Sequence, residues 1–190
     1  MKIKLLSTIS IAVLIGMMST ASATDFKYSY IEGAYQDIDL DGLDGEAYKV
    51  SGSYNLNSNI NVIGEYTNGE ITNPMGGSDL NFDEAAIGLG YHTGISSATD
   101  FTANIKLVAH DNDLTGDDTG YGVGVGIRHM LTDKIEVGSN IDYVDVNDIG
   151  DTTFKLNSRY HLNDRASFGL SYSTSEESND IISGGVRFEF

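Results

Sequence analysis

The sequence predicts an all-β fold, a transmembrane antiparallel up-and-down β-barrel of ten strands, with eight strands as the alternative. Three observations predict it: an N-terminal export signal, ten runs in which apolar and polar residues alternate, and aromatic residues gathered at the ends of these runs. No helical period of apolar residues interrupts the alternation. The 190 residues suffice for one such unit and not for several domains.

The first 23 residues have the features of a signal peptide. Two lysines give a positively charged start, an apolar stretch follows over residues 5–18, and Ala21-Ser22-Ala23 form a small-residue cleavage site. The apolar stretch is short for the alternative, an uncleaved membrane anchor. We therefore expect an exported protein with a signal peptide at 1–23 and a barrel at 24–190.

Composition excludes several functional classes. The chain has 28 acidic and 11 basic residues, a formal net charge of −17, and no cysteine. Without cysteine it has no disulfide scaffold, no thiolate metal site and no cysteine nucleophile. Nucleic acid is excluded as a partner, because binding phosphates requires Lys and Arg to release counterions.

Each alternating run is about ten residues long, enough to cross the apolar band of an outer membrane at a tilt of about 40°. The runs cover residues 26–36, 46–55, 60–68, 81–93, 100–111, 120–130, 135–145, 153–162, 166–175 and 181–190. The longer connections are 37–45, 69–80, 112–119, 146–152 and 176–180. Long outer loops, short periplasmic turns and an even strand number are typical of membrane barrels. Eight strands would require two runs to stand above the membrane as loop hairpins, which their uncharged faces disfavour.

One face of each run carries no charge. In the run 100–111, Phe101, Ile105 and Leu107 share one face and Lys106 lies on the other. A charge that faces lipid at the membrane centre costs about 2–4 kcal/mol, which explains the absence. Aromatic residues favour the headgroup level. Beside the short turns lie Tyr54, Tyr91, Phe101, Tyr160, Phe168, Phe188 and Phe190, and beside the long loops lie Tyr35, Tyr48, Tyr66, Tyr121, Tyr143, Phe154 and Tyr172. A water-soluble sandwich would explain the alternation but not this sorting.

The opposite face carries the ionisable residues. They are Lys49, Glu65, Glu84, Lys106, Arg128, Glu136, Asp142, Lys155, Arg159, Arg187 and Glu189. Charges inside a narrow barrel are costly unless paired, so we expect cross-strand salt bridges and hydrogen bonds that fill the lumen. Placing Glu32 on this face also turns Tyr28 and Tyr30 inward. The glycines at 120, 122, 124 and 126 leave space opposite for long side chains or a thread of water.

Both ends of the predicted barrel carry motifs of a known family. Residues 28–35 read YSYIEGAY, followed by an Asp/Gly-rich loop, and the last eight residues read SGGVRFEF. The chain resembles the small outer-membrane β-barrel proteins of Gram-negative bacteria, the OmpA- and OmpX-like group, and within it a ten-stranded subset that begins YxYxEGxY. Ser183, Gly185, Phe188 and Phe190 match the family's C-terminal assembly signal in full. The resemblance implies a place in the cell outer membrane, contact with its lipid and lipopolysaccharide, and recognition of the last strand by the β-barrel assembly machinery.

The first long loop is the only candidate metal site. Asp37, Asp39 and Asp41, with Gly42 in the sixth position, imitate the start of an EF-hand loop. The twelfth position is Tyr48 instead of a bidentate Glu, and no helices flank the loop, so a solvated acidic loop is the better interpretation. No resident metal or cofactor is expected, although the acidic outer loops would attract divalent cations and basic partners.

The enzymatic interpretations are weaker than the non-enzymatic ones. His110 and Asp111, near Asp113, imitate a fragment of a ten-stranded outer-membrane protease, and His129 is the only outward histidine that could serve a barrel lipase. The loops are too short to build a groove, so no enzyme is expected and a hydrolase is a distant alternative. A structural or surface-interaction barrel with a filled lumen is favoured over a narrow channel for water or small ions, because paired long side chains occlude the lumen.

Overall fold

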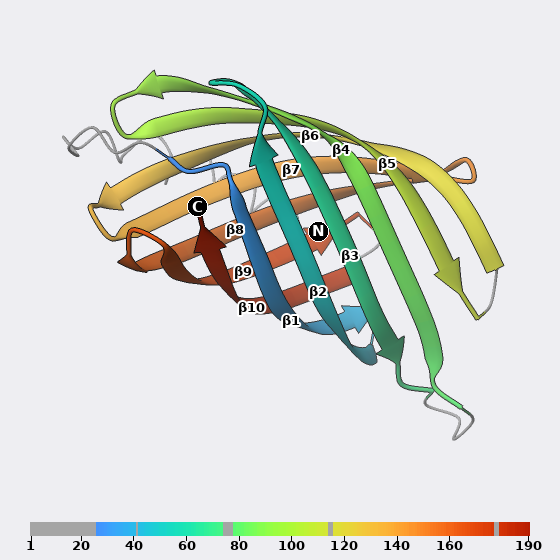
Figure 1. Cartoon of the computed structure of the whole chain (residues 1–190). Coiled ribbons are helices and arrows are strands. Elements are labelled where there is room, and N and C mark those ends of the chain that lie inside the picture. Colours follow the sequence, from blue (N-terminus) through green and yellow to red (C-terminus); the bar gives the residue numbers. More distant parts are fainter. Residues whose placement is uncertain (1–25, 41, 74–77, 114–115, 177–178) are drawn as a thin grey trace.

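The computed structural model describes residues 26–190 except 41, 74–77, 114–115 and 177–178, and it shows a closed barrel of ten antiparallel strands (Figure 1). The strands are β1 (Tyr30–Leu40), β2 (Leu43–Asn55), β3 (Ile60–Ile71), β4 (Leu80–Ser96), β5 (Thr99–Asn112), β6 (Gly116–Thr132), β7 (Ile135–Val146), β8 (Ile149–Asn163), β9 (Ala166–Ser175) and β10 (Asn179–Glu189). The predicted fold class is confirmed, with ten strands and not eight. The predicted signal peptide lies outside the described residues.

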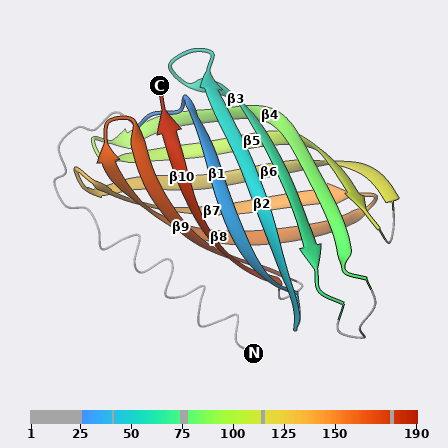
Figure 2. The same cartoon turned by 60° about the horizontal axis from the view of Figure 1, so that its bottom comes forward.

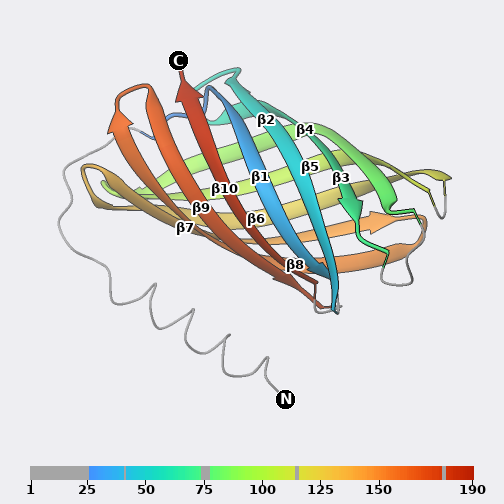
Figure 3. The same ribbon diagram turned by 90° about the horizontal axis from the view of Figure 1, so that it is seen from below.

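Every strand pairs with its neighbour in the chain, and β1 pairs with β10 to close the barrel. This last ladder runs without a shift from Tyr30 opposite Glu189 to Leu40 opposite Asn179. Figures 2 and 3 show the two strands side by side, with the C-terminal end of β10 beside the start of β1. Closure leaves no strand edge unpaired, and a barrel is the only sheet that satisfies all its backbone groups within lipid.

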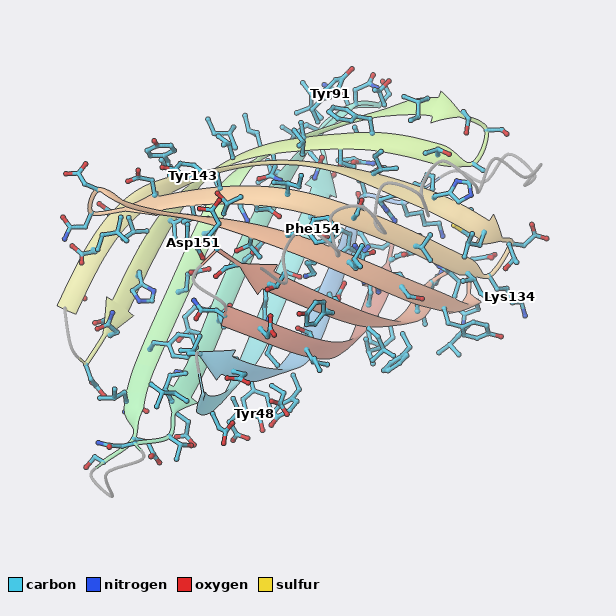
Figure 4. The ribbon with its side chains drawn as sticks, turned by 180° about the vertical axis from the view of Figure 1, so that it is seen from behind. Tyr48, Tyr91, Lys134, Tyr143, Asp151 and Phe154 are labelled. Carbon is cyan, nitrogen blue, oxygen red and sulfur yellow. The ribbon has the colours of Figure 1, made fainter. Side chains whose placement is uncertain are left out.

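In the alternating runs, the apolar residues of the strands face outward and the polar ones inward, as predicted. Leu107, on the apolar face of β5, is 69% exposed, whereas its neighbour Lys106 lies on the inner face. Tyr48 and Tyr91 likewise point away from the barrel, near opposite ends of it (Figure 4). The large exposed hydrophobic side chains therefore form the outer surface that a bilayer would cover. Within the described residues, no helix is long and apolar enough to cross a membrane.

The strands extend further on the extracellular side than the sequence predicts. The predicted loop 37–45 is mostly strand, since Leu40 pairs with Leu43, and the predicted loop 146–152 shrinks to the turn at Asn147 and Asp148. Both turn residues have positive φ, 55° and 63°, as a tight two-residue hairpin turn requires. The acidic residues assigned to surface loops therefore mostly lie on strand ends. The first strand begins late, at Tyr30 instead of residue 26.

The hydrophobic core sits inside these extensions. Ile38, Ala47 and Ile71 are buried together on the inner face of β1, β2 and β3. The partly buried side chains packed against them are Leu40, Leu80, Phe82 and Ile181. We call this group the extracellular cluster.

Candidate functional site: the lumen and its rims

Three carboxylates organise the inner face, and the first of them spans the closing seam. Glu32 on β1 accepts hydrogen bonds from Arg187 Nε on β10 at 2.6 Å and from Arg159 Nη2 on β8 at 2.8 Å. Arg159 reaches across β9 and β10 because small residues lie in its path. A Cβ at Gly169 would stand 3.1 Å from Arg159 Nη2. One carboxylate thus ties together strands three positions apart in the sheet.

The second carboxylate, Glu136 on β7, lies towards the end of the barrel with the short turns. It accepts two hydrogen bonds from Arg128, at 2.7 Å from Nε and 3.0 Å from Nη2. Its Oε2 also lies 3.2 Å from Nε2 of His161 on β8. The Glu136 side chain is only 3% exposed. Such a bidentate Arg–carboxylate pair is strong when desolvated, and removing one partner would leave a buried charge unpaired.

The third carboxylate, Glu65 on β3, is more accessible. It pairs with Lys49 on β2 at 2.6 Å and with Lys106 on β5 at 3.5 Å. Lys106 crosses β4 at Gly88, where a Cβ would stand 2.9 Å from the lysine Cγ. The Lys49 and Glu65 side chains keep 24% and 22% of their surface exposed. The middle of the lumen is therefore less tightly filled than the level of Glu136.

The other ionisable residues predicted for the inner face also lie inward, but they make fewer hydrogen bonds and ion pairs. Asp142 Oδ1 accepts a 3.4 Å hydrogen bond from Asn104, and both side chains occupy the space above Gly124. Lys155 makes no ion pair within 4 Å among the described residues. Glu189 is buried, and its Oε1 has no hydrogen-bond partner in the described part of the chain. Glu84 lies between Thr67 and His110 in the ladders of β4.

The glycine stripe of β6 holds side chains and is not an open passage. A Cβ at Gly124 would stand 2.1 Å from Asp142 Oδ1, and one at Gly126 would stand 2.3 Å from Asn140 Nδ2. Of the two possibilities predicted for this stripe, long side chains and water, the first describes these positions. Glycine is needed at 124 and 126 because the polar side chains of Asp142, Asn104 and Asn140 lie where a Cβ would stand.

Tyrosines mark the extracellular edge of the apolar outer surface, and four of them donate to a carboxylate. Tyr35 bonds Glu46, Tyr66 bonds Asp83, Tyr143 bonds Asp145 and Tyr172 bonds Asp180. Figure 4 shows Tyr143 near the extracellular end of β7 and Lys134 at the opposite end of the barrel. A tyrosine whose ring lies in an apolar layer and whose hydroxyl reaches a charge fits the headgroup level of a membrane. The carboxylates outside this level form an acidic belt.

A family comparison identifies the barrel. A model described as outer membrane protein beta-barrel domain matches residues 8–161 of the chain. The chain belongs to this family. The strand number, the apolar outer face and the level of tyrosines are therefore those of an outer-membrane barrel. In such barrels the short turns lie on the periplasmic side, together with the start of the first strand and the end of the last. A comparison with curated proteins gives no match.

The chain is similar to several solved structures at low sequence identity. The beta domain of the Bordetella autotransporter BrkA is 8% identical, with 87% of this chain and 100% of that chain covered and a TM-score of 0.52. An outer membrane channel from Pseudomonas putida F1 is 8% identical, covering 90% and 98%, with a TM-score of 0.50. The KdgM porin is 10% identical, covering 84% and 99%, with a TM-score of 0.47. At these identities the likeness extends to the fold alone.

The acidic segment with EF-hand-like spacing is mostly strand in the described residues of this outer-membrane barrel. Asp37 and Asp39 lie in β1, opposite Glu46 and Asp44, so the chain is extended where an EF-hand loop would wrap around an ion. Asp39 Oδ1 instead accepts a hydrogen bond from the Gly42 amide. Asp41 lies outside the described residues. No group of three His, Asp or Glu side chains arranged to hold a metal is found in the described ranges.

The histidines considered for a hydrolase are not arranged as a catalytic group in the barrel. His110 and Asp111 are consecutive in β5 and therefore point to opposite faces, His110 inward against Phe82 and Asp111 outward. The register keeps His129 in line with the outward-facing residues of β6, opposite Thr99 and Val137. Its side chain is nevertheless buried, with Nδ1 2.9 Å from the Thr99 hydroxyl, so it is not an exposed residue of the outer surface.

Sequence reasoning missed two features. The extracellular cluster lies partly in segments predicted as loops, 37–45 and 69–80, although the apolar residues at 38, 40, 71 and 80 are a visible signal. The second is Tyr28, which precedes β1 and stacks on His92 of β4 at the periplasmic mouth, with ring centroids 3.5 Å apart. Its inward direction followed from the alternation, but no sequence pattern pairs it with His92.

Proposed function

We propose that this protein is a structural and surface-interaction barrel of the outer membrane whose lumen is occluded at rest. The observation that carries the proposal is the ion pair between Arg159 on β8 and Glu32 on β1, which crosses two intervening strands. A long side chain that lies across the inner face takes up cross-section through which solutes would pass. The Arg128–Glu136 pair and the Lys49–Glu65–Lys106 group add two further obstructions.

The acidic belt supports a role at the outer leaflet. Opposite one another in the ladders lie Asp37, Glu46 and Glu70, and further round the barrel lie Asp83, Asp111 and Asp117. The described basic residues lie inward or at the periplasmic end, so this belt has no cation of its own. Phosphate groups of lipopolysaccharide would repel it unless divalent cations bridge the two. We therefore propose contact with lipopolysaccharide through bound divalent cations.

Export and assembly form part of the same proposal. An N-terminal signal peptide would deliver the chain to the periplasm, and the last strand would be recognised by the β-barrel assembly machinery. Phe188 is exposed on the outer face of β10 and Phe190 is exposed directly after the strand, whereas Ser183 and Gly185 lie inward, which supports a signal read from the outside of the strand. These residues, with YSYIEGAY at the start, support placement in the OmpA- and OmpX-like group.

A narrow channel is the second candidate. The partial exposure of Lys49 and Glu65 favours it, because it shows that water reaches the middle of the lumen. The occluded barrel is preferred because the periplasmic level is far more closely packed, with Glu136 almost fully buried.

Planar-bilayer conductance of the purified full-length barrel tests the choice. We expect no stable openings from the native barrel. Arg159→Ala removes the pair across the seam and should raise conductance, whereas Arg165→Ala, at an exposed periplasmic turn, should not. Steady openings of the native barrel would overturn the occluded barrel in favour of the channel.

A further inference from the structure

Four residues before β1 lie across the periplasmic mouth. We call residues Phe26–Ser29 the strap; none of them belongs to a strand of the barrel. Tyr28 is only 6% exposed, stacks on His92 at an angle of 10° between the rings, and donates a 2.8 Å hydrogen bond to Asp100 on β5. The strap thus starts at the seam beside β10 and reaches the opposite wall.

Arg128 on β6 clamps the strap from the lumen side. Its guanidinium carbon lies 4.7 Å from the ring centres of both Phe26 and Tyr28, and Nη1 donates to the Lys27 carbonyl at 3.4 Å. The remaining donors of Arg128 bind Glu136, so the clamp is itself held by the inner-face network. Lys27 Nζ donates to the carbonyl of Asp164 in the turn between β8 and β9. Three walls of the barrel therefore hold the strap.

Ser29 anchors the other end of the strap. Its carbonyl accepts a 3.1 Å hydrogen bond from the Phe190 amide, and its hydroxyl accepts one of 3.1 Å from the Asn55 amide. The first bond continues the backbone ladder between β1 and β10, and the second ties the Ser29 side chain to the end of β2. The strap therefore has a fixed end at Ser29 and an end held only by side-chain contacts and two bonds to carbonyls.

Two cavities, both partly open to solvent at the periplasmic mouth, flank the strap, and Phe26 lines both. One, of about 360 Å³, is also lined by Arg128, Glu136 and His161. The other, of about 390 Å³, is lined by Tyr28, His92 and Asp100. The strap is the partition between them. Displacing it would merge two spaces that each exceed the volume of several water molecules, at about 30 Å³ for one in the liquid.

We propose that the strap is a periplasmic gate, a removable plug whose displacement joins the two cavities and opens the lumen to the periplasm. Exposure along the lumen supports this position for the gate. His92, Glu136 and Glu189 at the periplasmic level are buried, whereas Lys49 and Glu65 further in are partly accessible. One of the two closely packed levels of the interior, the periplasmic one, therefore coincides with the strap, the other being the extracellular cluster. Contacts of stacking, cation–π and charge-assisted hydrogen-bond type hold it, and none of them is covalent.

Tyr28→Ala in the full-length barrel is the test. It removes the stack on His92, the bond to Asp100 and the contact of the ring with Arg128. In the Arg159→Ala background, where the pair across the lumen is absent, it should raise time-averaged conductance in a planar bilayer by about tenfold or more. Tyr54→Ala is the matched control, because Tyr54 is a tyrosine near the same end of the barrel but exposed on its outer face. Heat-modifiable gel mobility and circular dichroism establish that each variant is folded. Should Tyr28→Ala not fold, Phe26→Ala, which loses only its contact with Arg128, takes its place.

The outcomes separate the gate from the occluded barrel. A folded Arg159→Ala/Tyr28→Ala barrel that conducts better than Arg159→Ala alone supports the gate. A folded double variant that conducts no better than Arg159→Ala overturns the gate and leaves the occluded lumen standing. A native barrel that already conducts overturns the occluded lumen, and the gate then stands only if Tyr28→Ala raises conductance further.

Discussion

The inner and outer faces of β1, β2 and β3 exchange their polarity at the tyrosine level. On the membrane side of that level, Glu32, Lys49 and Glu65 face inward and apolar residues face outward. On the extracellular side, the inward positions are Ile38, Ala47 and Ile71, and the outward ones are Asp37, Glu46 and Glu70. The strands and their pairing continue without interruption across this change.

The exchange follows the solvent outside the barrel. Where hydrocarbon covers the outer face, polar groups are confined to the lumen and satisfy one another there. Where water covers the outer face, the inward residues pack as in a water-soluble β-protein, and the carboxylates are hydrated outside. One continuous sheet thus has an ionic interior in one half and an apolar interior in the other. The predictions below test whether the two halves obey these different rules.

Removing the shared carboxylate of the seam should have the largest effect. Glu32→Ala leaves Arg159 and Arg187 facing each other without their partner and should lower the free energy of unfolding by about 3–5 kcal/mol. Denaturant unfolding in detergent or lipid measures it. Glu70→Ala, at an outward position of the acidic belt, is the control and should change stability by less than about 0.5 kcal/mol. If Glu32→Ala and Glu70→Ala lowered the free energy of unfolding equally, the proposed difference between the inner face and the acidic belt would be contradicted.

An added charge should be costly on one side of the tyrosine level and harmless on the other. Val50→Arg on β2 places a charge against lipid and should cost about 2–4 kcal/mol, whereas Asp44→Arg on the same strand and face should cost little. Both side chains are exposed on the outer face. The folded fraction on a heat-modifiable gel and the unfolding free energy report the difference. If Val50→Arg left the folded fraction and the free energy of unfolding unchanged, the proposed position of the membrane boundary would be wrong.

Truncating a side chain of the extracellular cluster should lower the free energy of unfolding by less than Glu32→Ala or Val50→Arg does. Ile71→Ala removes a buried side chain and should cost roughly 2 kcal/mol, the low end for such a change. Protease cleavage of the outer hairpins should speed up accordingly. Ile149→Ala is the matched control, since Ile149 is an exposed isoleucine at the extracellular end of β8. If both variants behave alike, the cluster does not stabilise the extensions.

Acid titration should show the smallest effect. Beyond the tyrosine level, the carboxylates of Asp117 and Asp83 raise the pKa of Asp111, whereas hydrogen bonds from the backbone and side chain of Asn81 lower the pKa of Asp113. A raised pKa means that the folded barrel binds this proton more tightly than the unfolded chain, so the Asp111 contribution to stability falls as the pH rises through the raised pKa. The lowered pKa of Asp113 has the opposite effect, so its contribution to stability is lost as the pH falls. NMR titration of the side chains should give Asp111 the higher pKa, and the reverse order would refute the repulsion.

The exchange of polarity explains where sequence reasoning stopped. The predicted first run ended at residue 36 because Asp37 follows Gln36 and the apolar residues move to the other face at Ile38. The alternation itself continues to Leu40, but with the opposite polarity, which was interpreted as a loop. The late start of β1 has another cause, since Tyr28 keeps the spacing of an inward residue while it belongs to the strap.

The inner-face residues could be chosen from the sequence, but their partners could not. Alternation puts Arg159 and Glu32 on the polar face, although 126 other residues separate them in the chain. Their contact depends on β1 meeting β10 and on Gly169 leaving room for the guanidinium. The same holds for Arg128, whose three contacts with the strap come from a segment about a hundred residues earlier.

The sequence by itself determined the architecture of this protein: strand number, the face that meets hydrocarbon and the two aromatic levels follow from a period of two and from the cost of exposing a charge to lipid. Those are local properties of each strand. Only the tertiary structure decided which charges meet, how far the hairpins rise above the membrane and what closes the periplasmic mouth. These depend on shear, on closure of the seam and on the room left by individual glycines, which act between residues far apart in the chain.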